Sequence, residues 1–247
     1  MPHEYSATFF DYIEQGSIRS ARAIVGPLAG QLKPASVLDV GCGRGLWLRE
    51  WKNAGVERVF GIDGHYVDRL CIAADEFKAV DLSLPFDLGQ RFDLVMSVEV
   101  AEHLPPASAQ GFVRSLIAHG DCILFSAATV GQGGTDHINE RPLGYWRGLF
   151  AAEGYECFDC ARPLVADDPS IEPWYRYNTL LYVHESRVAG LPQAIKATHV
   201  LHSAPLRDYE SAGWKCRKLV LRAMPRPVVT WLALKNAAMQ ARRAKAR

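Results

Sequence analysis

Short apolar runs alternate with longer amphipathic segments along most of the chain. Apolar runs of about four to eight residues bounded by glycine or charged residues predict buried strands, and apolar residues spaced three or four apart predict helices. Strands are expected at residues 36–40, 57–62, 77–80, 92–98, 121–126, 155–160 and 178–184. Helices are expected at residues 17–32, 45–54, 65–70, 107–118 and 142–153. This alternation is typical of a doubly wound α/β sheet.

The regular pattern ends before the end of the chain, which divides the sequence into three regions. We predict an N-terminal helical segment at residues 1–34, an α/β domain at residues 35–190 and a helical appendage at residues 191–247. Aromatic residues in the first region predict a lid over the functional site, although such a cluster also arises from plain packing: Tyr5, Phe9, Phe10 and Tyr12.

Charge separates the appendage from the rest of the protein. The chain has 247 residues, of which 49% are apolar and 22% charged, so it can bury a sizeable core. Residues 215–247 carry ten Lys or Arg and no Asp or Glu, which leaves 18 basic and 27 acidic residues elsewhere. Trp231 lies in an apolar stretch among these basic residues, after Pro225 and Pro227. This composition is typical of a helix that rests on anionic headgroups, and equally of a solvated tail.

The cysteine pattern and the N-terminus predict a reduced, cytoplasmic protein, at the inner face of the membrane if the tail binds lipid. The six cysteines lack the spacing of a disulfide framework, and residues 1–5 do not resemble a secretory signal. No apolar run is long enough to span a bilayer. Cys157 and Cys160 form a C-x-x-C pair, but in a strand they point to opposite faces, so zinc is not expected there.

The turn after the first strand carries three alternating glycines. Gly41, Gly43 and Gly45 follow Asp39 and Val40 at a predicted change from strand to helix. Glycine permits a positive φ and close approach of the backbone to a ligand at the carboxyl end of a parallel strand. The G-x-G-x-G spacing differs from the G-x-G-x-x-G of dinucleotide sites. The turn therefore predicts a site for another nucleotide-like ligand.

The next two strand ends add polar side chains to this site. Asp63 closes the second strand, and its carboxylate can accept hydrogen bonds from both hydroxyls of a ribose. Asp81 and Leu82 follow the third strand and could hold an adenine, the carboxylate accepting from its amine while leucine covers the ring. A turn cap by Asp81 is the alternative.

The fourth strand runs directly into an acidic and histidine-rich segment. If the chain begins to coil at Glu99, then Glu99, Glu102 and His103 share one helical face, since residues three and four apart are neighbours. A glycine-rich loop after the fifth strand brings a further candidate, His137. Two carboxylates with imidazoles predict a divalent-cation site.

The glycine turn and the acidic strand ends resemble motif I and the following acidic position of class I S-adenosylmethionine-dependent methyltransferases. The resemblance implies a Rossmann-like seven-stranded sheet with its final strand antiparallel, and S-adenosylmethionine as the cofactor. It implies that Asp39 and the backbone of Gly41 to Gly45 face the methionine part and that Asp63 binds the ribose. The complete predicted cofactor site consists of Asp39, Gly41, Cys42, Gly43, Gly45, Asp63, Asp81, Leu82 and Glu99.

The E-x-x-E-H pattern is similar to that of metal-dependent O-methyltransferases, including ubiquinone-pathway enzymes and small-RNA 2′-O-methyltransferases. The matching residues, which we predict as metal ligands, are Glu99, Glu102, His103 and His137. Carboxylate and imidazole ligands favour Mn²⁺, Fe²⁺, Co²⁺ or Zn²⁺ over Mg²⁺, which would keep several waters. A cation would lower the pKa of an attacking hydroxyl. Two alternatives stay open, metal-free base catalysis by His137 and a purely structural cluster.

The region from about residue 15 to 185 is also similar to bacterial methyltransferases of surface-polysaccharide and glycan pathways, through residues 98–105, 125–128, 131–140 and 174–178. We therefore predict an O-methyltransferase acting on a hydroxyl of a sugar, glycan or glycolipid, with His137 and His103 as catalytic residues. The predicted acceptor-binding residues are Asp136, Asn139, Glu140, Trp174, Tyr175 and Asn178. The predicted α/β domain shows no basic surface with interleaved aromatic residues, so we do not expect it to bind nucleic acid.

Two other functions stay open. One is methyl transfer to nitrogen or carbon of a small metabolite, without a metal. The other is a non-catalytic cofactor-binding subunit that docks on a glycosyltransferase or membrane complex through its basic tail.

Overall fold

The computed structural model describes residues 7–67 and 69–245, without the side chains of residues 7–14, 226, 236–238 and 240–245. The strands are β1 (Ser36–Val40), β2 (Arg58–Asp63), β3 (Phe77–Ala79), β4 (Leu94–Val98), β5 (Cys122–Ser126), β6 (Tyr155–Phe158), β7 (Leu180–His184) and β8 (His199–Val200). The main helices are α1 (Ala7–Leu32), α2 (Leu46–Asn53), α3 (Ala109–Ala118), α4 (Leu143–Ala152), α9 (Ala212–Arg222) and α10 (Arg226–Lys245). Shorter helices are α5 (Arg162–Val165), α6 (Pro173–Asn178), α7 (Glu185–Val188) and α8 (Gln193–Lys196), with 3₁₀ turns η1 (Ala74–Glu76), η2 (Ala101–His103) and η3 (Pro106–Ser108).

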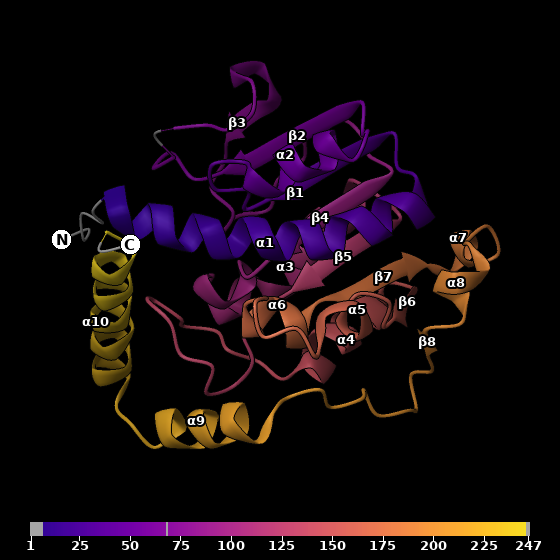
Figure 1. Ribbon diagram of the computed structural model, residues 1–247. Coiled ribbons are helices and arrows are strands. Elements are labelled where there is room, and N and C mark those ends of the chain that lie inside the picture. The colour runs from indigo at the N-terminus through magenta and orange to yellow at the C-terminus, as the bar shows by residue number, and fades with distance from the viewer. Residues whose placement is uncertain (1–6, 68, 246–247) are drawn as a thin grey trace.

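The described strands form a single sheet in the order β3-β2-β1-β4-β5-β7-β6-β8 (Figure 1). The pairings among β1 to β5 are parallel, whereas β7 pairs antiparallel with both β5 and β6. The predicted doubly wound sheet with an antiparallel final strand is thus confirmed. One edge strand was not predicted: β8 has only two residues, too few for a hydrophobic pattern, and pairs antiparallel with β6. The strand order reverses between β1 and β4, which is where such sheets bind ligands.

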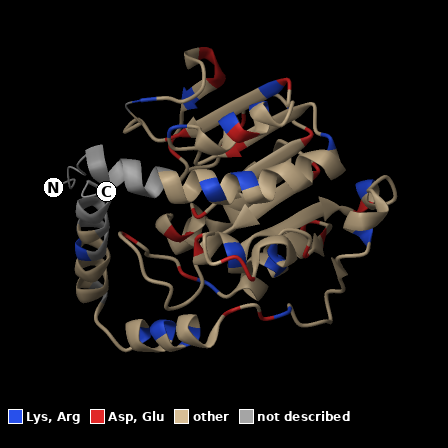
Figure 2. Ribbon diagram, in the orientation of Figure 1, with Lys and Arg blue, Asp and Glu red and all other residues tan. Residues whose placement is uncertain are grey.

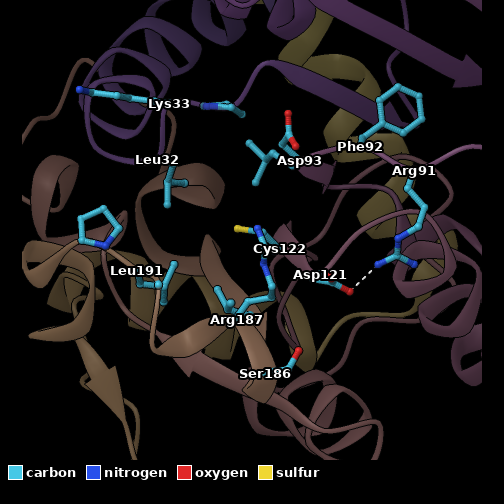
Figure 3. A pocket seen from close by; sticks show the side chains of 15 residues that line it. Leu32, Lys33, Arg91, Phe92, Asp93, Asp121, Cys122, Ser186, Arg187 and Leu191 are labelled. Atoms are coloured by element: carbon cyan, nitrogen blue, oxygen red, sulfur yellow. Dashed lines mark hydrogen bonds and ion pairs between the residues drawn. The ribbon is translucent and has the colours of Figure 1, made fainter.

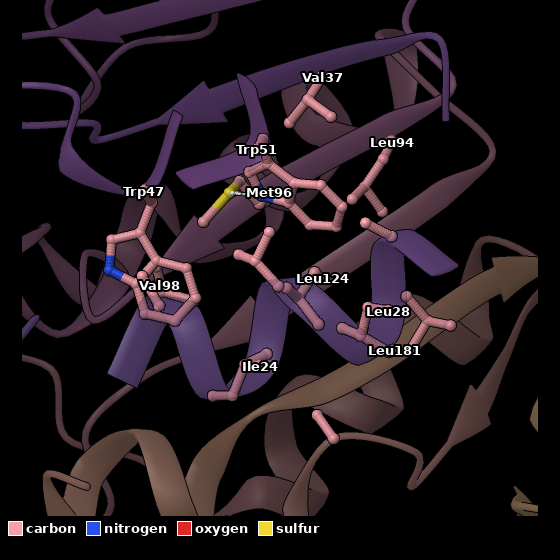
Figure 4. Packing of buried hydrophobic residues seen from close by; sticks show 14 of the residues in the cluster. Ile24, Leu28, Val37, Trp47, Trp51, Leu94, Met96, Val98, Leu124 and Leu181 are labelled. Carbon is pink, nitrogen blue, oxygen red and sulfur yellow. Dashed lines mark hydrogen bonds between the residues drawn. The ribbon is translucent and has the colours of Figure 1, made fainter. Parts of the chain in front are cut away.

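Apolar side chains on alternate strand positions fill both faces of the sheet. On one face, Val37, Met96 and Leu124 contact a layer that contains Ile24 of α1 and Trp51 of α2 (Figure 4). The opposite face is covered by α3 and α4, which contribute residues such as Phe112 and Phe150. Because both faces are covered, the strands are nearly continuous apolar runs. A polar ligand site can therefore form only at the ends of the strands.

Three predictions in the first 70 residues differ from the structure or lie outside the described residues. Helix α1 begins at Ala7 rather than near residue 17. The described residues of the segment 65–70, which leave out residue 68, form no helix, and a turn lies at His65 and Tyr66. The reason is local, since the Asp63 carboxylate accepts hydrogen bonds from the Gly64 amide and the Tyr66 hydroxyl. For the predicted lid, Tyr5 and the side chains of Phe9, Phe10 and Tyr12 lie outside the described residues.

The C-terminal helices fold back onto the α/β domain. Helix α10 contacts α1, and α9 crosses beneath the loop that follows β5 (Figure 1). The break between them falls at Ala223–Pro225, as the two prolines predict. The ribbon of α9 carries Lys and Arg positions, and the segment just before it carries acidic positions (Figure 2). Over the described residues, no helix combines the length and apolarity needed to cross a membrane.

Candidate active site

Two connected clefts lie at the carboxyl edge of the parallel strands. The smaller, about 290 Å³, lies between the glycine turn, Trp47 and Tyr175. The larger, about 750 Å³, extends past the ends of β2 and β3 to His103. Both clefts are lined by Gly41, Tyr66 and Glu99, so they meet at the ends of β1 and β4. This is the position predicted from the strand order.

The glycine turn adopts the backbone that its sequence predicts. Gly41, Gly43 and Gly45 have φ values of 87°, 52° and 83°, a region that disfavours residues with a Cβ atom. A Cβ atom at Gly41 would also lie 2.3 Å from Val100. The Gly43 amide donates a 2.6 Å hydrogen bond to Asp63, which ties the turn to the end of β2. The turn is therefore preorganised along the floor of the smaller cleft.

Asp39 supplies an unsatisfied acceptor to the smaller cleft. Its side chain is 1% exposed, and Oδ1 has no hydrogen-bond partner among the described residues. Burial and then the charge of Asp63 raise the pKa of Asp39. A buried, unpaired carboxylate oxygen is costly unless a ligand donates to it. Asp39 thus fits the ammonium group of a methionine moiety, and Cys42 lines the same cleft.

Asp63 and Tyr66 form a pair between the two clefts. Asp63 is 4% exposed, and its two oxygens accept from the amides of Gly43 and Gly64 and from the Tyr66 hydroxyl. Tyr66 itself is 78% exposed. Sequence reasoning missed Tyr66, because nothing in a lone tyrosine after a strand predicts that its hydroxyl bonds to the acidic strand end.

Asp81 and Leu82 line the larger cleft beyond Asp63. Leu82 is buried, whereas Asp81 is exposed and its Oδ1 accepts from the amide and hydroxyl of Ser83 at 2.9 and 2.6 Å. These hydrogen bonds lower the pKa of Asp81. Asp81 therefore caps a turn, which is the alternative to adenine binding named in the sequence analysis. It also lines the larger cleft.

Glu102, His103 and His137 come together at the end of β4. One ligand atom from each of these side chains lies within 4.8 Å of the others, and they are the one group of this kind among the described residues. Glu102 is 1% exposed, and neither carboxylate oxygen has a hydrogen-bond partner. Burial and the nearby Glu99 raise its pKa. Two unpaired buried oxygens beside two imidazoles fit a divalent cation.

The imidazoles of this cluster are arranged for coordination. Their rings meet edge to face with centroids 4.9 Å apart. Nδ1 of His137 lies 3.0 Å from Glu140, which leaves Nε2 for a cation or a proton. Desolvation and the neighbouring His137 lower the pKa of His103 to about 4, which keeps this imidazole neutral at pH 7.

Glu99 takes a different position from the one expected. Its φ of 57° is left-handed, so the single helical face shared with Glu102 does not form, and η2 starts only at Ala101. Its carboxylate accepts from Gln132 at 2.7 Å and from Asn178 at 3.4 Å. Burial raises its pKa, and these hydrogen bonds oppose the rise. Glu99 lies outside the metal-ligand group and lines both clefts, so we assign it to the cofactor site alone.

Gln132 was not predicted, yet it links the two walls of the site. This buried amide donates to Glu99 and accepts a 2.8 Å hydrogen bond from Asn178. Asn178 reaches this edge because β7 runs antiparallel, so the residue preceding the strand lies at the carboxyl edge of the others. Only the three-dimensional meeting of the loop after β5 with the start of β7 gives Gln132 its role.

The loop at residues 131–140 is held by its own acidic and amide groups. Glu140 accepts from the amides of Gly131 and Gly133, both at 2.7 Å, as well as from His137. Although burial raises the pKa of Glu140, the hydrogen bonds from His137 and these amides lower it overall. The Asn139 amide bonds to the Ala101 carbonyl and to Arg141. We therefore assign Glu140 and Asn139 to support of the loop instead of acceptor binding.

Of the remaining predicted acceptor residues, Asp136 and Tyr175 each line one cleft, and Trp174 lines neither. Asp136 lines the larger cleft near His103. Tyr175 lines the smaller one, with its ring 5.1 Å from that of Trp47. Trp174 packs beside Tyr175 at 6.1 Å and is half-buried. Tyr175 therefore stands closer to the predicted methionine end than to an acceptor.

Comparison with known proteins agrees with this geometry. A family model described as a methyltransferase domain matches residues 12–159. The chain is 29% identical to a ubiquinone biosynthesis O-methyltransferase of Acinetobacter baylyi over 192 residues, 73% of this chain and 72% of that protein. It is 30% identical to a protein of the same name from Alkalilimnicola ehrlichii over 140 residues, 51% of this chain and half of that protein.

Solved structures share the fold at low sequence identity. The methyltransferase domain of bacterial CtHen1-C has a TM-score of 0.50 at 18% identity and covers 68% of this chain and 98% of its own. Magnesium protoporphyrin IX methyltransferase from Synechocystis PCC 6803, solved with S-adenosylhomocysteine, has a TM-score of 0.50 at 18% identity, covering 75% and 90%. With the glycine turn, the buried Asp39 and the matched family model, these findings show that the chain belongs to the class I S-adenosylmethionine-dependent methyltransferases.

Proposed function

We propose that the protein is an O-methyltransferase that methylates a hydroxyl group of a sugar, glycan or glycolipid with the assistance of a divalent cation. One observation carries the proposal: the carboxylate of Glu102 is buried, unpaired, and grouped with His103 and His137. A cation held by these side chains would satisfy both orphaned oxygens. The oxygen specificity is also supported by the names of the curated relatives, which are O-methyltransferases of ubiquinone biosynthesis.

The chemistry requires a nucleophilic oxygen beside the methyl donor. S-adenosylmethionine, when bound, supplies an electrophilic methyl group on a sulfonium. A sugar hydroxyl has a pKa far above 7 and must lose its proton as it attacks, and a coordinated cation lowers that pKa. Glu140 fixes the ring of His137 through Nδ1, so the side chain presents Nε2 in one orientation. Asp39, Asp63 and the turn at Gly43 would hold the donor on the opposite wall.

The cation requirement is tested by binding and by turnover. We expect Mn²⁺ to bind the full chain in calorimetry, and the variant Glu102→Gln to weaken that binding at least about tenfold. Methyl transfer from radiolabelled S-adenosylmethionine to a panel of monosaccharides should stop in excess chelator and return on addition of Mn²⁺. Full activity in chelator would remove the cation from the mechanism.

A second glutamate between two histidines offers a matched control. Glu156 lies 2.9 Å from His199 and 3.3 Å from His202 at the β6–β8 edge, away from the clefts. The variant Glu156→Gln should bind Mn²⁺ like the unmodified protein. Turnover at the unmodified rate in the variant His137→Ala would exclude both the cation-assisted mechanism and a base role for His137.

The acceptor class is tested in the same assay with a phenol as the competitor. The names of the curated relatives favour a small phenolic or quinone-pathway acceptor as the second candidate. Catechol has a hydroxyl that is far easier to deprotonate than that of a sugar, so its methylation would depend less on the cation. Methylation of catechol without methylation of any monosaccharide would replace the sugar by this class.

A peripheral contact of the basic tail with an anionic membrane or glycolipid is part of the same proposal. Its support is the exposure of apolar side chains on the tail helices, with Leu219 at 65%, Val220 at 50% and Trp231 at 51%. The Lys235 ammonium lies 4.2 Å over the Trp231 ring, a cation beside an amphipathic anchor. Cosedimentation with phosphatidylglycerol vesicles but not phosphatidylcholine vesicles, reduced in Trp231→Ala, is the expected result.

A further inference from the structure

Two adjoining cavities lie along helix α9, next to the loop that carries His137. The first, about 400 Å³, lies between residues 131–141 of that loop and residues 221–230 of the tail, and His137 lines it. The second, about 510 Å³, lies between α9 and residues 206–210. Val130 and Arg222 line both, so the two cavities meet at these side chains. The tail therefore forms one wall of a space that is also lined by His137, a member of the group of Glu102, His103 and His137.

Three of the five cationic side chains that line the second cavity are paired with carboxylates, whereas Arg207, which stacks on the Tyr209 ring, and Arg222 have no described carboxylate partner. Lys215 pairs with Asp208 at 2.6 Å, and Lys218 pairs with Glu210 at 2.6 Å. Arg162 makes a two-pronged pair with Asp159. The Arg222 side chain has neither a hydrogen bond nor an ion pair with any residue that the structure describes, and of these two arginines it is the one that lines both cavities. Its charge is thus left for a ligand at the junction of the cavities.

The stem of Arg222 is fixed even though its head is exposed. A Cβ atom added to Gly131 would lie 2.5 Å from Cγ and 2.9 Å from Cδ of Arg222, so the stem lies directly on the loop backbone. Helix α9 is anchored there by Arg217, which donates to the Gln132 carbonyl at 2.5 Å, and by Lys218, which donates to Thr129 at 3.0 Å. A guanidinium on a fixed stem loses less entropy on binding an anion.

We propose that Arg222 binds an anionic group, a phosphate or a carboxylate, on the acceptor whose hydroxyl is methylated at the His137 side of the cleft. This inference rests on the proposed function and narrows the acceptor to a negatively charged sugar or glycan. Guanidinium and phosphate or carboxylate groups match as two-pronged hydrogen-bond partners. The acceptor would enter between α9 and the loop at residues 131–141. Its anionic group would lie at Arg222, and its hydroxyl would point toward His137.

An arginine at the opposite edge of the sheet provides a matched control. Arg187 is exposed, its side chain has no described hydrogen bond or ion pair, and it lines a cavity of about 630 Å³ with Lys33 and Cys122 (Figure 3). Arg91 and Asp121 pair with each other in the same cavity. This cavity lies where the parallel strands begin, so an anion there would be separated from the methyl donor by the length of the sheet.

The test measures anion binding without turnover. The full chain, saturated with S-adenosylhomocysteine, is titrated at constant ionic strength with inorganic phosphate, followed by phosphorus NMR, and with acetate, followed by saturation-transfer proton NMR. The variant Arg222→Met keeps the aliphatic stem and removes the charge, and Arg222→Lys keeps the charge. Saturable binding should weaken at least about tenfold in Arg222→Met and persist in Arg222→Lys and Arg187→Met. Affinity for S-adenosylhomocysteine checks that each variant is folded.

The two anions identify the source of the charge. Phosphate binding that depends on Arg222 supports a phosphorylated acceptor, and acetate binding that depends on it supports a uronic acid. Absence of saturable binding, or equal binding by Arg222→Met, overturns the inference. A failure of the proposed function looks different, since monosaccharides would then remain unmethylated while phosphate or acetate still bound at Arg222.

Discussion

The hydroxyl of Tyr66 donates a hydrogen bond to Oδ1 of Asp63, the carboxylate that the class I resemblance assigns to the ribose of the cofactor. The ribose hydroxyls and Tyr66 therefore compete for the same oxygen. Removing this hydroxyl in Tyr66→Phe should strengthen S-adenosylhomocysteine binding by about two- to tenfold, since a hydrogen bond of this kind is worth about 0.5–1.5 kcal/mol net. Calorimetry measures the change. Weaker binding would mean that Tyr66 itself contacts the cofactor.

The two acidic residues at neighbouring strand ends should differ in their effect on the cofactor. Asp63→Ala removes a buried carboxylate that also anchors the Gly43 amide, so we expect S-adenosylhomocysteine affinity to fall more than about a hundredfold. Asp81→Ala should change that affinity less than about fivefold, because the Asp81 carboxylate is engaged by Ser83. Equal losses in the two variants would return Asp81 to the adenine site.

Glu140 is expected to act on turnover and not on cofactor binding. Its carboxylate accepts hydrogen bonds from His137 and from the amides of Gly131 and Gly133. In Glu140→Gln one oxygen is replaced by a donor that cannot accept from an amide, so the loop and the His137 ring lose their alignment. We expect kcat to fall about 10- to 100-fold with unchanged S-adenosylhomocysteine affinity. An unchanged kcat would separate the orientation of His137 from catalysis.

Gly131 is the point where the loop at residues 131–140 meets helix α9. Its φ of 85° disfavours a side chain, and a Cβ atom there would lie 2.7 Å from the backbone oxygen of Lys218. Gly131→Ala should therefore destabilise the protein by about 1–3 kcal/mol and displace α9. Gly148→Ala in α4 is the matched control, because a Cβ atom there meets nothing within 4 Å and should be neutral or slightly stabilising. Thermal unfolding compares the two, and equal melting temperatures would contradict the tight contact.

Features that depend on neighbouring residues were predictable from the sequence. The positive φ values at Gly41, Gly43 and Gly45 and the end of β2 at Asp63 follow from the local alternation of apolar residues, glycine and acid. The parallel order of the central strands follows from the same alternation. The reversal of β7 came only from the family resemblance, because hydrophobic periodicity carries no strand direction.

Features that depend on distant segments were not predictable. Gln132 contacts Glu99 and Asn178 only because β5 and β7 are neighbours in the sheet. The left-handed backbone of Glu99 was missed because the sequence favoured a helix that starts there. In the structure, the Glu99 amide instead donates to the Ser126 carbonyl of β5. The docking of α9 on the loop was missed for the same reason, since a run of basic residues indicates charge and says nothing of the surface against which it packs.

The burial of the cysteines has a practical consequence for experiments on the tail. Cys42, Cys157 and Cys160 are buried, and burial raises the pKa of each, which suppresses the reactive thiolate. Cys71 and Cys122 are half-buried, and Cys216 of α9 is the one exposed thiol of the six. A maleimide dye should therefore label Cys216 of the native protein fastest. Fluorescence from that dye would report in real time whether α9 lifts when an acceptor or a lipid vesicle is added.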